Sequence, residues 1–230
     1  MMNKRIIVLS LGGSLIVPEK IEPKWLDNFK KIILKNTRKW KFVIFCGGGF
    51  IARDYISILS FEHKSMKEQS LAGIMVTRMN AKIMMQFFGD SSNKNLPTNM
   101  EEIKNMLEKD KIVFCGALRY APNQTSDSTA SKLASYLKTD FVNLTNIDGL
   151  YTDNPKKNKK AKFIPQISWK EFETMANKLK YHPGQHFVLD QKASKIINKK
   201  KIKTYIIGQE IKNLDNLLNG KYFRGTTIAQ

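Results

Sequence analysis

Short apolar runs alternate along the chain with segments of helical periodicity, and this alternation limits the possible folds more than any other feature. The runs at residues 6–9 and 42–46 are each followed by consecutive glycines, and further runs stand at 112–115 and 141–145. Uninterrupted apolar runs predict strands that are buried on both faces of a sheet. Strands that alternate with helices predict βαβ units. We therefore expect an α/β fold with a mainly parallel central sheet.

The helices are predicted from apolar residues that recur every three or four positions. Pro23 suits the start of a helix, and Thr98 or Asn99 suits a helix cap. A polar segment at 146–165 is too long for an ordinary connection, which predicts a functional loop. No repeat or change of composition divides the chain, so we expect one domain over residues 1–230. The expected helices cover residues 25–33, 51–59, 68–88, 103–107, 125–137, 168–178, 189–198 and a last stretch that ends at Gly220, with a further strand at 202–207.

The chain carries 39 lysines and arginines against 20 aspartates and glutamates, a formal charge of +19. Such a balance raises the question of a nucleic-acid or membrane-surface partner. Nearly all the cations are lysines, and enrichment in Lys and Asn over Arg is typical of an AT-rich coding genome. Phe and Tyr are not interleaved with the lysine runs at 156–162 and 199–203. We therefore expect no specific nucleic-acid partner.

The two cysteines and the N-terminus bear on the compartment. Cys46 and Cys115 lie in apolar runs beside glycine, which predicts small buried core residues instead of a disulfide or a metal site. No apolar stretch of about 18 residues is present, and the N-terminus leads into a glycine turn where a signal peptide would have its cleavage region. We expect a cytoplasmic protein with no membrane partner.

Two glycine loops follow predicted strands and predict a phosphate site. Gly12-Gly13-Ser14 follows the first strand, and Gly47-Gly48-Gly49 leads from the second strand into a helix. Glycine lets the backbone approach an anion, and a helix N-terminus supplies positive potential. A tight turn is the simpler interpretation of each loop, and neither has the Walker or Gly-x-Gly-x-x-Gly pattern. Arg53, one helical turn further on, suits phosphate, although a lone arginine on a helix is commonly a solvated surface residue.

Two further segments place polar groups where a ligand could bind. Residues 125–128 (Thr-Ser-Asp-Ser) open a predicted helix, where a hydroxyl also serves simply as an N-cap. Asp127 would then lie in the first helical turn, stabilised by the helix dipole, and could orient a metal or cationic group without itself titrating. The segment 145–155 follows a predicted strand. Open parallel sheets bind their ligands there, beyond the carboxyl ends of the strands.

Six blocks stand in a characteristic order along nearly the whole chain. They are Leu-Gly-Gly-Ser (11–14), Gly-Gly-Gly-x-x-Ala-Arg-x-Tyr-Ile (47–56), Gly-Ile-Met-Val-Thr-Arg-Met-Asn-Ala (73–81), Thr-Ser-Asp-Ser (125–128), Thr-Asn-Ile-Asp-Gly-Leu-Tyr-Thr-Asp-Asn-Pro-Lys-Lys (145–157) and Phe-Val-Leu-Asp-Gln-Lys-Ala-Ser-Lys-Ile-Ile (187–197). Together they resemble the amino acid kinase family, and in particular its archaeal-type uridylate kinases. The resemblance implies a three-layer αβα sandwich, with the acceptor on the N-terminal half (about 1–120) and ATP on the C-terminal half (about 121–230).

The reaction that the resemblance implies is direct in-line transfer of the γ-phosphoryl group of MgATP to UMP, which gives UDP for pyrimidine nucleotide synthesis. Such chemistry depends on positioning and charge neutralisation. The Mg²⁺ would be held mainly by the ATP phosphates, with no metal site of the protein's own. The family also implies a homo-oligomer, a hexamer built from dimers.

The resemblance implies roles for individual residues. Asp127, Arg53 and Ser14 are the expected catalytic residues, with Asp127 organising the centre. Asp190 matches an acidic position near the nucleotide, although an N-cap of the following helix explains it equally well. The expected ATP-binding residues are Gly13, Ser14, Gly49, Arg53, Thr145, Asn146, Tyr151 and Asn154. The expected UMP-binding residues are Gly48, Ser70, Tyr120, Ala121, Pro122, Asn123, Gln124, Thr125 and Ser126.

The chain also departs from the family pattern. Ser10 stands where many members carry a catalytic lysine, and Asn154 where an aspartate that contacts ATP is common, with Asp153 beside it. Ser70 stands where uridylate kinases usually place an aspartate that holds the ribose, and Glu68 lies on the wrong side of the helix to replace it. The loop at 116–124 is about two residues longer than the family's. These departures bear on the identity of the acceptor more than on the phosphoryl transfer itself.

Two alternatives to a UMP kinase therefore stay open. One is a kinase of the same family that acts on another small phosphorylated acceptor, such as isopentenyl phosphate. That branch usually has a histidine after its glycine triplet, where this chain has the sequence Phe-Ile-Ala-Arg at 50–53. The other is a non-catalytic nucleotide or oxyanion binding protein on the same fold.

Overall fold

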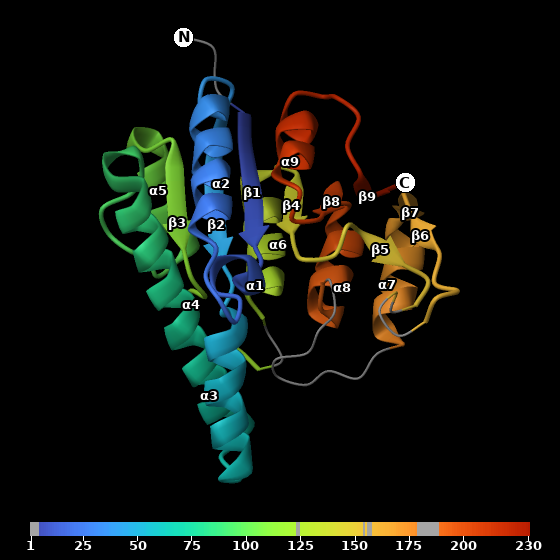
Figure 1. Ribbon diagram of the computed structural model, residues 1–230, viewed down its shortest axis with the longest axis horizontal. Coiled ribbons are helices and arrows are strands. Elements are labelled where there is room, and N and C mark those ends of the chain that lie inside the picture. Colours follow the sequence, from blue (N-terminus) through green and yellow to red (C-terminus); the bar gives the residue numbers. More distant parts are fainter. Residues whose placement is uncertain (1–4, 123–124, 154, 156–157, 179–188) are drawn as a thin grey trace.

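The computed structural model describes residues 5–122, 125–153, 155, 158–178 and 189–230. Its central sheet has seven strands in the order β3-β2-β1-β4-β8-β9-β7 (Figure 1). All neighbouring strands are parallel except β8 and β9. The seven are β1 (Arg5–Leu11), β2 (Trp40–Cys46), β3 (Ile112–Cys115), β4 (Phe141–Leu144), β7 (Gln166–Ser168), β8 (Thr204–Ile207) and β9 (Gly225–Ala229).

Helices cover both faces of this sheet, which gives the predicted three layers (Figure 1). The faces separate because alternate strand residues point to opposite sides: Ile7 and Leu9 belong to one core cluster, and Val8 to the other. The first cluster is closed by α1 (Gly13–Ile16), α2 (Pro23–Asn36), α4 (Met66–Phe88) and α9 (Ile211–Leu218). The second is closed by α5 (Met100–Lys109), α6 (Ser126–Leu137), α7 (Trp169–Asn177) and α8 (Gln191–Lys200).

Several local predictions are confirmed residue by residue. Pro23 occupies the first turn of α2, and the Asn99 side chain caps α5 by accepting from the Glu102 amide at 2.9 Å. Gly89 ends α4 with a positive φ of 60°, a conformation that costs glycine little. Cys46 and Cys115 are fully buried free thiols in the two neighbouring strands β2 and β3. The predicted helix at 68–88 begins slightly earlier, at a capping box formed by Ser65 and Glu68.

The sheet's far edge was not predicted. Residues 225–229 (Gly-Thr-Thr-Ile-Ala) form β9, and β7 pairs with β9 alone. The segment 146–165 is not purely a loop, because β5 (Leu150–Tyr151) and β6 (Phe163–Ile164) form an antiparallel pair within it. β5 and β6 have two residues each, too few to produce a recognisable apolar run.

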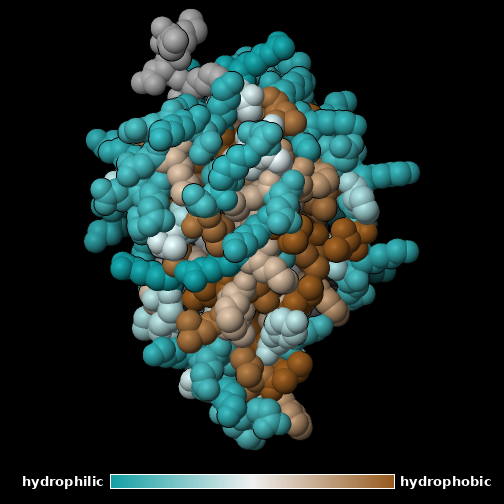
Figure 2. Space-filling view, turned by 90° about the vertical axis from the view of Figure 1, so that its left-hand side faces the viewer, coloured by the Kyte–Doolittle hydropathy of each residue, from teal (hydrophilic) through white to brown (hydrophobic). Residues whose placement is uncertain are grey.

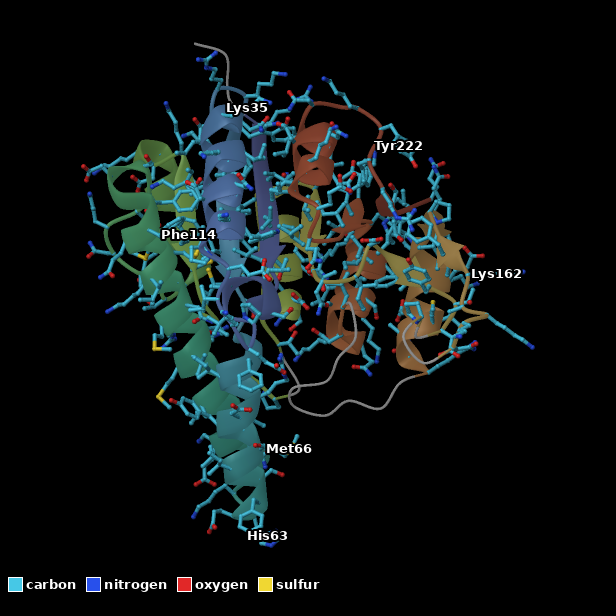
Figure 3. The ribbon with its side chains drawn as sticks, in the orientation of Figure 1. Lys35, His63, Met66, Phe114, Lys162 and Tyr222 are labelled. Atoms are coloured by element: carbon cyan, nitrogen blue, oxygen red, sulfur yellow. The ribbon has the colours of Figure 1, made fainter. Side chains whose placement is uncertain are left out.

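Helices α3 (Gly49–Phe61) and α4 form a hairpin that extends beyond the carboxyl ends of the parallel strands (Figure 1). His63 and Met66 lie at its tip, at the opposite end of the molecule from Lys35 (Figure 3). Within the described ranges, no helix combines the length and apolar character needed to cross a bilayer. The hairpin borders the carboxyl ends of the strands, where the sequence predicts the site. The side of the hairpin that faces these ends can therefore shape the site.

Candidate active site

The two predicted glycine loops lie in direct backbone contact. Strands β1 and β2 are parallel neighbours with Leu11 opposite Cys46, so the loops that follow them leave the sheet side by side. A Cβ atom on Gly13 would lie 1.9 Å from the Gly49 nitrogen, and one on Gly47 would lie 2.4 Å from the Gly13 nitrogen. Only glycine at both positions permits this approach. The sequence predicted each loop separately, and the sheet register brings them together.

The second loop leads directly into α3. Gly49 adopts a φ of +69°, and the next amide, that of Phe50, donates to the Val17 carbonyl at 3.1 Å. Within the described ranges, no side chain caps this helix. The N-terminus of a 13-residue helix, with its positive dipole end, therefore points at the junction of the two loops. Arg53 is half-buried one turn into α3, and no ion pair among the described residues includes it.

Asp127 meets the end of β1 from the other side. The Ser10 hydroxyl, 2% exposed, donates to the Asp127 carboxylate at 2.6 Å. Loss of hydration raises the pKa of Asp127 to about 7, and the nearby Asp190 carboxylate raises it too, while the hydrogen bond from Ser10 opposes the rise. This pKa differs from the expectation that Asp127 acts without titrating, because desolvation outweighs the hydrogen bond from Ser10. Ser10 holds this carboxylate with a neutral group.

Asp190 and Thr125 form a second link between helices. Asp190 caps α8 by accepting from the amides of Lys192 at 2.7 Å and Ala193 at 2.9 Å, as one of the two predicted interpretations requires. The Thr125 hydroxyl also donates to the Asp190 carboxylate. Thr125 in turn caps α6, the helix that carries Asp127. One connected polar cluster thus joins the N-termini of α6 and α8 at the carboxyl edge of the sheet.

The residues expected around ATP lie along the same edge. The Thr145 amide extends β4 by donating to the Ile207 carbonyl at 3.0 Å, and Asn146 follows it. Tyr151 is in β5, with its ring 5.4 Å from that of Phe163. Asn154 lies outside the described residues. The predicted segment is therefore held at both ends, at Thr145 by β8 and at Tyr151 by β6.

Among the residues expected around UMP, Ser70 forms a hydrogen bond within its own helix. Its hydroxyl donates at 2.7 Å to the Met66 carbonyl, four residues earlier in α4, so its hydrogen is already used within the helix. Tyr120 and Ala121 are partly exposed in the loop after β3, and the Pro122 carbonyl accepts from Lys192 at 3.0 Å. Residues 123 and 124 (Asn and Gln) lie outside the described ranges.

Sequence reasoning missed the part of α4 that contacts these loops. Thr77, Arg78 and Asn80 all hydrogen-bond to loop backbone, either at the glycine triplet or after β3. They lie in the block 73–81, which marked the family resemblance without suggesting any role. The available signal was polarity: Thr77 and Asn80 are two of the three buried polar residues in the described part of α4, whose other buried side chains are apolar.

Known proteins resemble the chain over nearly its full length. A model described as the amino acid kinase family matches residues 5–208. Uridylate kinase from Pyrococcus abyssi is 33% identical over 224 residues, covering 96% of this chain and 98% of the relative. Uridylate kinase from Methanocaldococcus jannaschii is 35% identical over 229 residues, with the same coverage.

Solved structures agree with the sequence comparison. The crystal structure of uridylate kinase from Archaeoglobus fulgidus superposes with a TM-score of 0.84 at 31% identity, over 97% of this chain and 99% of that one. UMP kinase from Ureaplasma parvum, at 22% identity, shares the fold with a TM-score of 0.80 over the full length of both chains. With the family model spanning most of the sheet and close relatives matched end to end, the chain belongs to the amino acid kinase family.

Proposed function

We propose that the protein is a UMP kinase, an enzyme that transfers the γ-phosphoryl group of ATP to UMP and yields UDP and ADP for pyrimidine nucleotide synthesis in the cytoplasm. The observation that carries this proposal is the contact between Gly13 and Gly49, which places two backbone loops and a helix N-terminus around one point. The relatives at 33% and 35% identity, both uridylate kinases, supply the choice of substrates.

The proposed substrates divide between the two halves of one domain. Residues of the N-terminal half, about 1–120, form the acceptor side, and those of the C-terminal half, about 121–230, form the ATP side. The proposed ATP contacts are Gly13, Ser14, Gly49, Arg53, Thr145, Asn146, Tyr151 and Asn154. The proposed UMP contacts are Gly48, Ser70, Tyr120, Ala121, Pro122, Asn123, Gln124, Thr125 and Ser126.

In the proposed mechanism, an oxygen of the UMP phosphate attacks the γ-phosphorus of ATP in line with the departing ADP oxygen. No covalent enzyme intermediate is required, so catalysis comes from alignment and charge neutralisation. Backbone amides at Gly13 and Gly49 and the α3 N-terminus stabilise negative charge on the transferred group. Arg53, free of carboxylate partners in the described ion pairs, adds a fork of donors. Ser14 lies in the first turn of α1, beside the two loops.

Mg²⁺ is proposed to enter with ATP. In the described part of the chain, no group of three or more His, Cys, Asp or Glu side chains is placed to hold a metal ion. We therefore propose an ion carried by the nucleotide phosphates instead of one resident in the protein. When bound there, the ion neutralises phosphate charge.

Turnover assays with MgATP and three acceptors, UMP, CMP and isopentenyl phosphate, test the proposal. The proposal is supported if UDP forms and UMP has the highest kcat/KM of the three acceptors. Preference for another acceptor would replace UMP in the proposal. The Ser70 hydroxyl, which donates to the Met66 carbonyl, would contact a ribose as an acceptor. Absence of turnover with all three, together with nucleotide binding, identifies a binding protein.

We also propose that the protein is a homo-oligomer, a hexamer built from dimers. Leu71, Met75, Met79 and Ile83 repeat every four residues along one face of α4, with 39–65% of each residue exposed. We call these four residues the α4 apolar stripe. Figure 2 shows a brown apolar band on this side of the molecule that continues toward the tip of the α3–α4 hairpin. A continuous exposed band of this kind marks an interaction surface, whereas scattered apolar residues do not.

A further inference from the structure

A single turn of α4, Thr77–Asn80, hydrogen-bonds to both loops that flank the proposed phosphoryl-transfer point. We propose that Asn80 and Arg78 are positioning residues that hold the glycine triplet and the loop after β3 at a fixed separation. This inference rests on the proposed kinase function, and it assigns a role to the block 73–81. Neither residue is proposed to touch a substrate.

Asn80 holds the glycine triplet. Its side chain is 2% exposed, and its Nδ2 donates to the Gly47 carbonyl at 2.8 Å and to the Gly48 carbonyl at 3.3 Å. These carbonyls belong to the residues that precede Gly49 and the N-terminus of α3. Glycine by itself allows many backbone conformations, so a loop of three glycines needs external hydrogen bonds to keep one of them. Asn80 supplies two such bonds from a buried helix position.

Arg78 and Thr77 hold the other loop. The Thr77 hydroxyl accepts from the Ala117 amide at 3.0 Å, and the Arg78 Nε donates to the Ala117 carbonyl at 2.9 Å. A second guanidinium nitrogen donates to the next carbonyl, that of Leu118. A planar guanidinium can serve two successive carbonyls at once, whereas the single ammonium of a lysine cannot keep this geometry. The start of the loop that carries Tyr120–Pro122 is thereby fixed to α4.

Backbone contacts show that both loops rest on the same helical turn. A Cβ atom on Gly116 would lie 2.6 Å from the Arg78 nitrogen, so the chain passes against the α4 backbone there. A Cβ on Gly48 would lie 3.7 Å from the Thr77 methyl carbon. Thr77 therefore bonds to the loop after β3 and lies near Gly48 of the glycine triplet. Neither loop can shift relative to the other without breaking hydrogen bonds to this turn.

The kinetic consequences of the two contacts should differ. The glycine triplet lies at the proposed meeting point of donor and acceptor phosphates, so losing Asn80 should disturb alignment in the transition state and lower kcat. A misplacement of about 1 Å can cost on the order of 100-fold in rate. The loop after β3 leads to the proposed acceptor residues, so losing the Arg78 fork should mainly raise the KM for UMP.

The test compares Asn80→Ala with Asn36→Ala and Arg78→Lys with Arg38→Lys. Asn36 is a matched control, because it is 3% exposed and its Nδ2 donates to the Ile32 carbonyl and to Asp215, at the end of α2. Arg38 is exposed beyond α2. For Asn80→Ala we expect a 10- to 100-fold lower kcat with a KM for ATP within about twofold of the wild type. For Arg78→Lys we expect a KM for UMP raised by about 10-fold, and near wild-type kinetics for both controls.

Equal loss of thermal stability in Asn80→Ala and Asn36→Ala with unchanged kcat in both would overturn the positioning role, since Asn80 would then be merely structural. Hydrogen exchange in the protein without substrates supplies a readout that does not depend on the proposed reaction. Each α4 variant should accelerate amide exchange most in the loop that loses its own bond, residues 47–50 for Asn80→Ala and 116–118 for Arg78→Lys, and to a smaller extent in the other loop, because one turn holds both loops. Acceleration confined to the loop that lost its own bond refutes the shared anchor. If the wild type does not phosphorylate UMP, the proposed function is refuted. The hydrogen-exchange result is unaffected, because it does not depend on the reaction.

Discussion

At the scale of single residues, the least expected feature is a carboxylate that is near its midpoint of ionisation at neutral pH. Asp127 has a pKa of about 7 because it gives up hydration and lies near Asp190, while Ser10 supplies one hydrogen bond in return. The sequence identified Asp127 as central from its place at a helix N-terminus. It could not reveal the pKa, which depends on how closely β1 and α8 approach that carboxylate.

The raised pKa predicts how stability varies with pH. Between about pH 4 and 7 native Asp127 keeps a proton that the unfolded chain releases, so its contribution makes the free energy of unfolding fall as the pH rises through this window. A neutral amide removes this effect. We expect Asp127→Asn to have a higher thermal midpoint than the wild type at pH 8, with the difference shrinking toward pH 4, and to lose most activity.

The gain at pH 8 is at most about 4 kcal/mol, from three pKa units at about 1.4 kcal/mol each, and is smaller to the extent that water reaches this half-buried carboxylate. Thermal unfolding of both proteins across the pH range provides the measurement. A midpoint difference that does not change with pH would contradict the assigned titration. Wild-type turnover in Asp127→Asn would remove Asp127 from the catalytic residues.

Ser10 offers a second prediction. Its hydrogen bond favours the ionised form of Asp127, so Ser10→Ala should raise the pKa of that carboxyl further. The profile of kcat/KM against pH reports groups of the free enzyme. If ionised Asp127 is the active form, the acidic limb of the profile should move to higher pH in the variant. An unmoved limb, with kcat reduced equally at every pH, would show that Ser10 only supports the local fold.

At the scale of elements, the sequence predicted the strands and loops that have a clear local pattern of residues. Strands β1 to β4 are mostly apolar because both faces of the sheet are covered, and the glycines that follow β1 and β2 marked their boundaries. β9 was missed because its Thr226 and Thr227 break the apolar run. Its place between β8 and β7 follows only from long-range pairing. For the same reason the sequence suggested two glycine loops but not their contact, nor their anchoring by Asn80.

Thr226 links β9 to the segment that carries Tyr151. Its fully buried hydroxyl accepts from the Leu150 amide at 2.7 Å and donates to the Ile164 carbonyl, so it joins the β5–β6 pair to the main sheet. Thr226→Val keeps the shape but removes both bonds. We expect a loss of about 1–3 kcal/mol in the free energy of unfolding, since the Leu150 amide is left without its acceptor.

If Tyr151 contributes to the ATP site, Thr226→Val should also raise the KM for ATP while leaving the KM for UMP unchanged. Thr204→Val is the matched control: Thr204 is also fully buried, and among the described residues its hydroxyl bonds to the Ile202 carbonyl alone, at 3.0 Å. Chemical denaturation measures the free energy of unfolding of both variants, and steady-state kinetics measures their KM for ATP and for UMP. A KM for ATP raised equally in the two would indicate general loosening of the sheet.

At the scale of the whole molecule, the charge of +19 and the exposed apolar band suggest different things about partners. The phosphate-binding groups proposed here are mostly backbone amides, hydroxyls and Arg53, so the many lysines are not needed to explain the site. Their field can still attract polyanionic nucleotides, an effect that salt screens. The apolar band, in contrast, is local, and it lies on the same helix that holds both loops.

Charged substitutions within the α4 apolar stripe should disrupt self-association. We expect the double variant Met75→Glu and Met79→Lys to sediment as a smaller species than the wild type, because burying either charge at an apolar interface is costly. Tyr222→Lys is the control, since Tyr222 is 88% exposed and lies at the other end of the molecule from the hairpin tip (Figure 3). A wild-type protein that sediments as a monomer would contradict the proposed assembly.

The position of β9 also governs the order in which the molecule can be built during translation. β7 has no partner in the main sheet except β9, which is synthesised later, after α7, α8, β8 and α9. A nascent chain can therefore pair β1, β2, β3 and β4 early, while β7 must wait for residues 225–229 to emerge. The proposed acceptor side is complete long before the edge that borders the proposed ATP segment. Until β8 emerges, ribosome-bound intermediates should expose the edge of β4 as an unpaired strand.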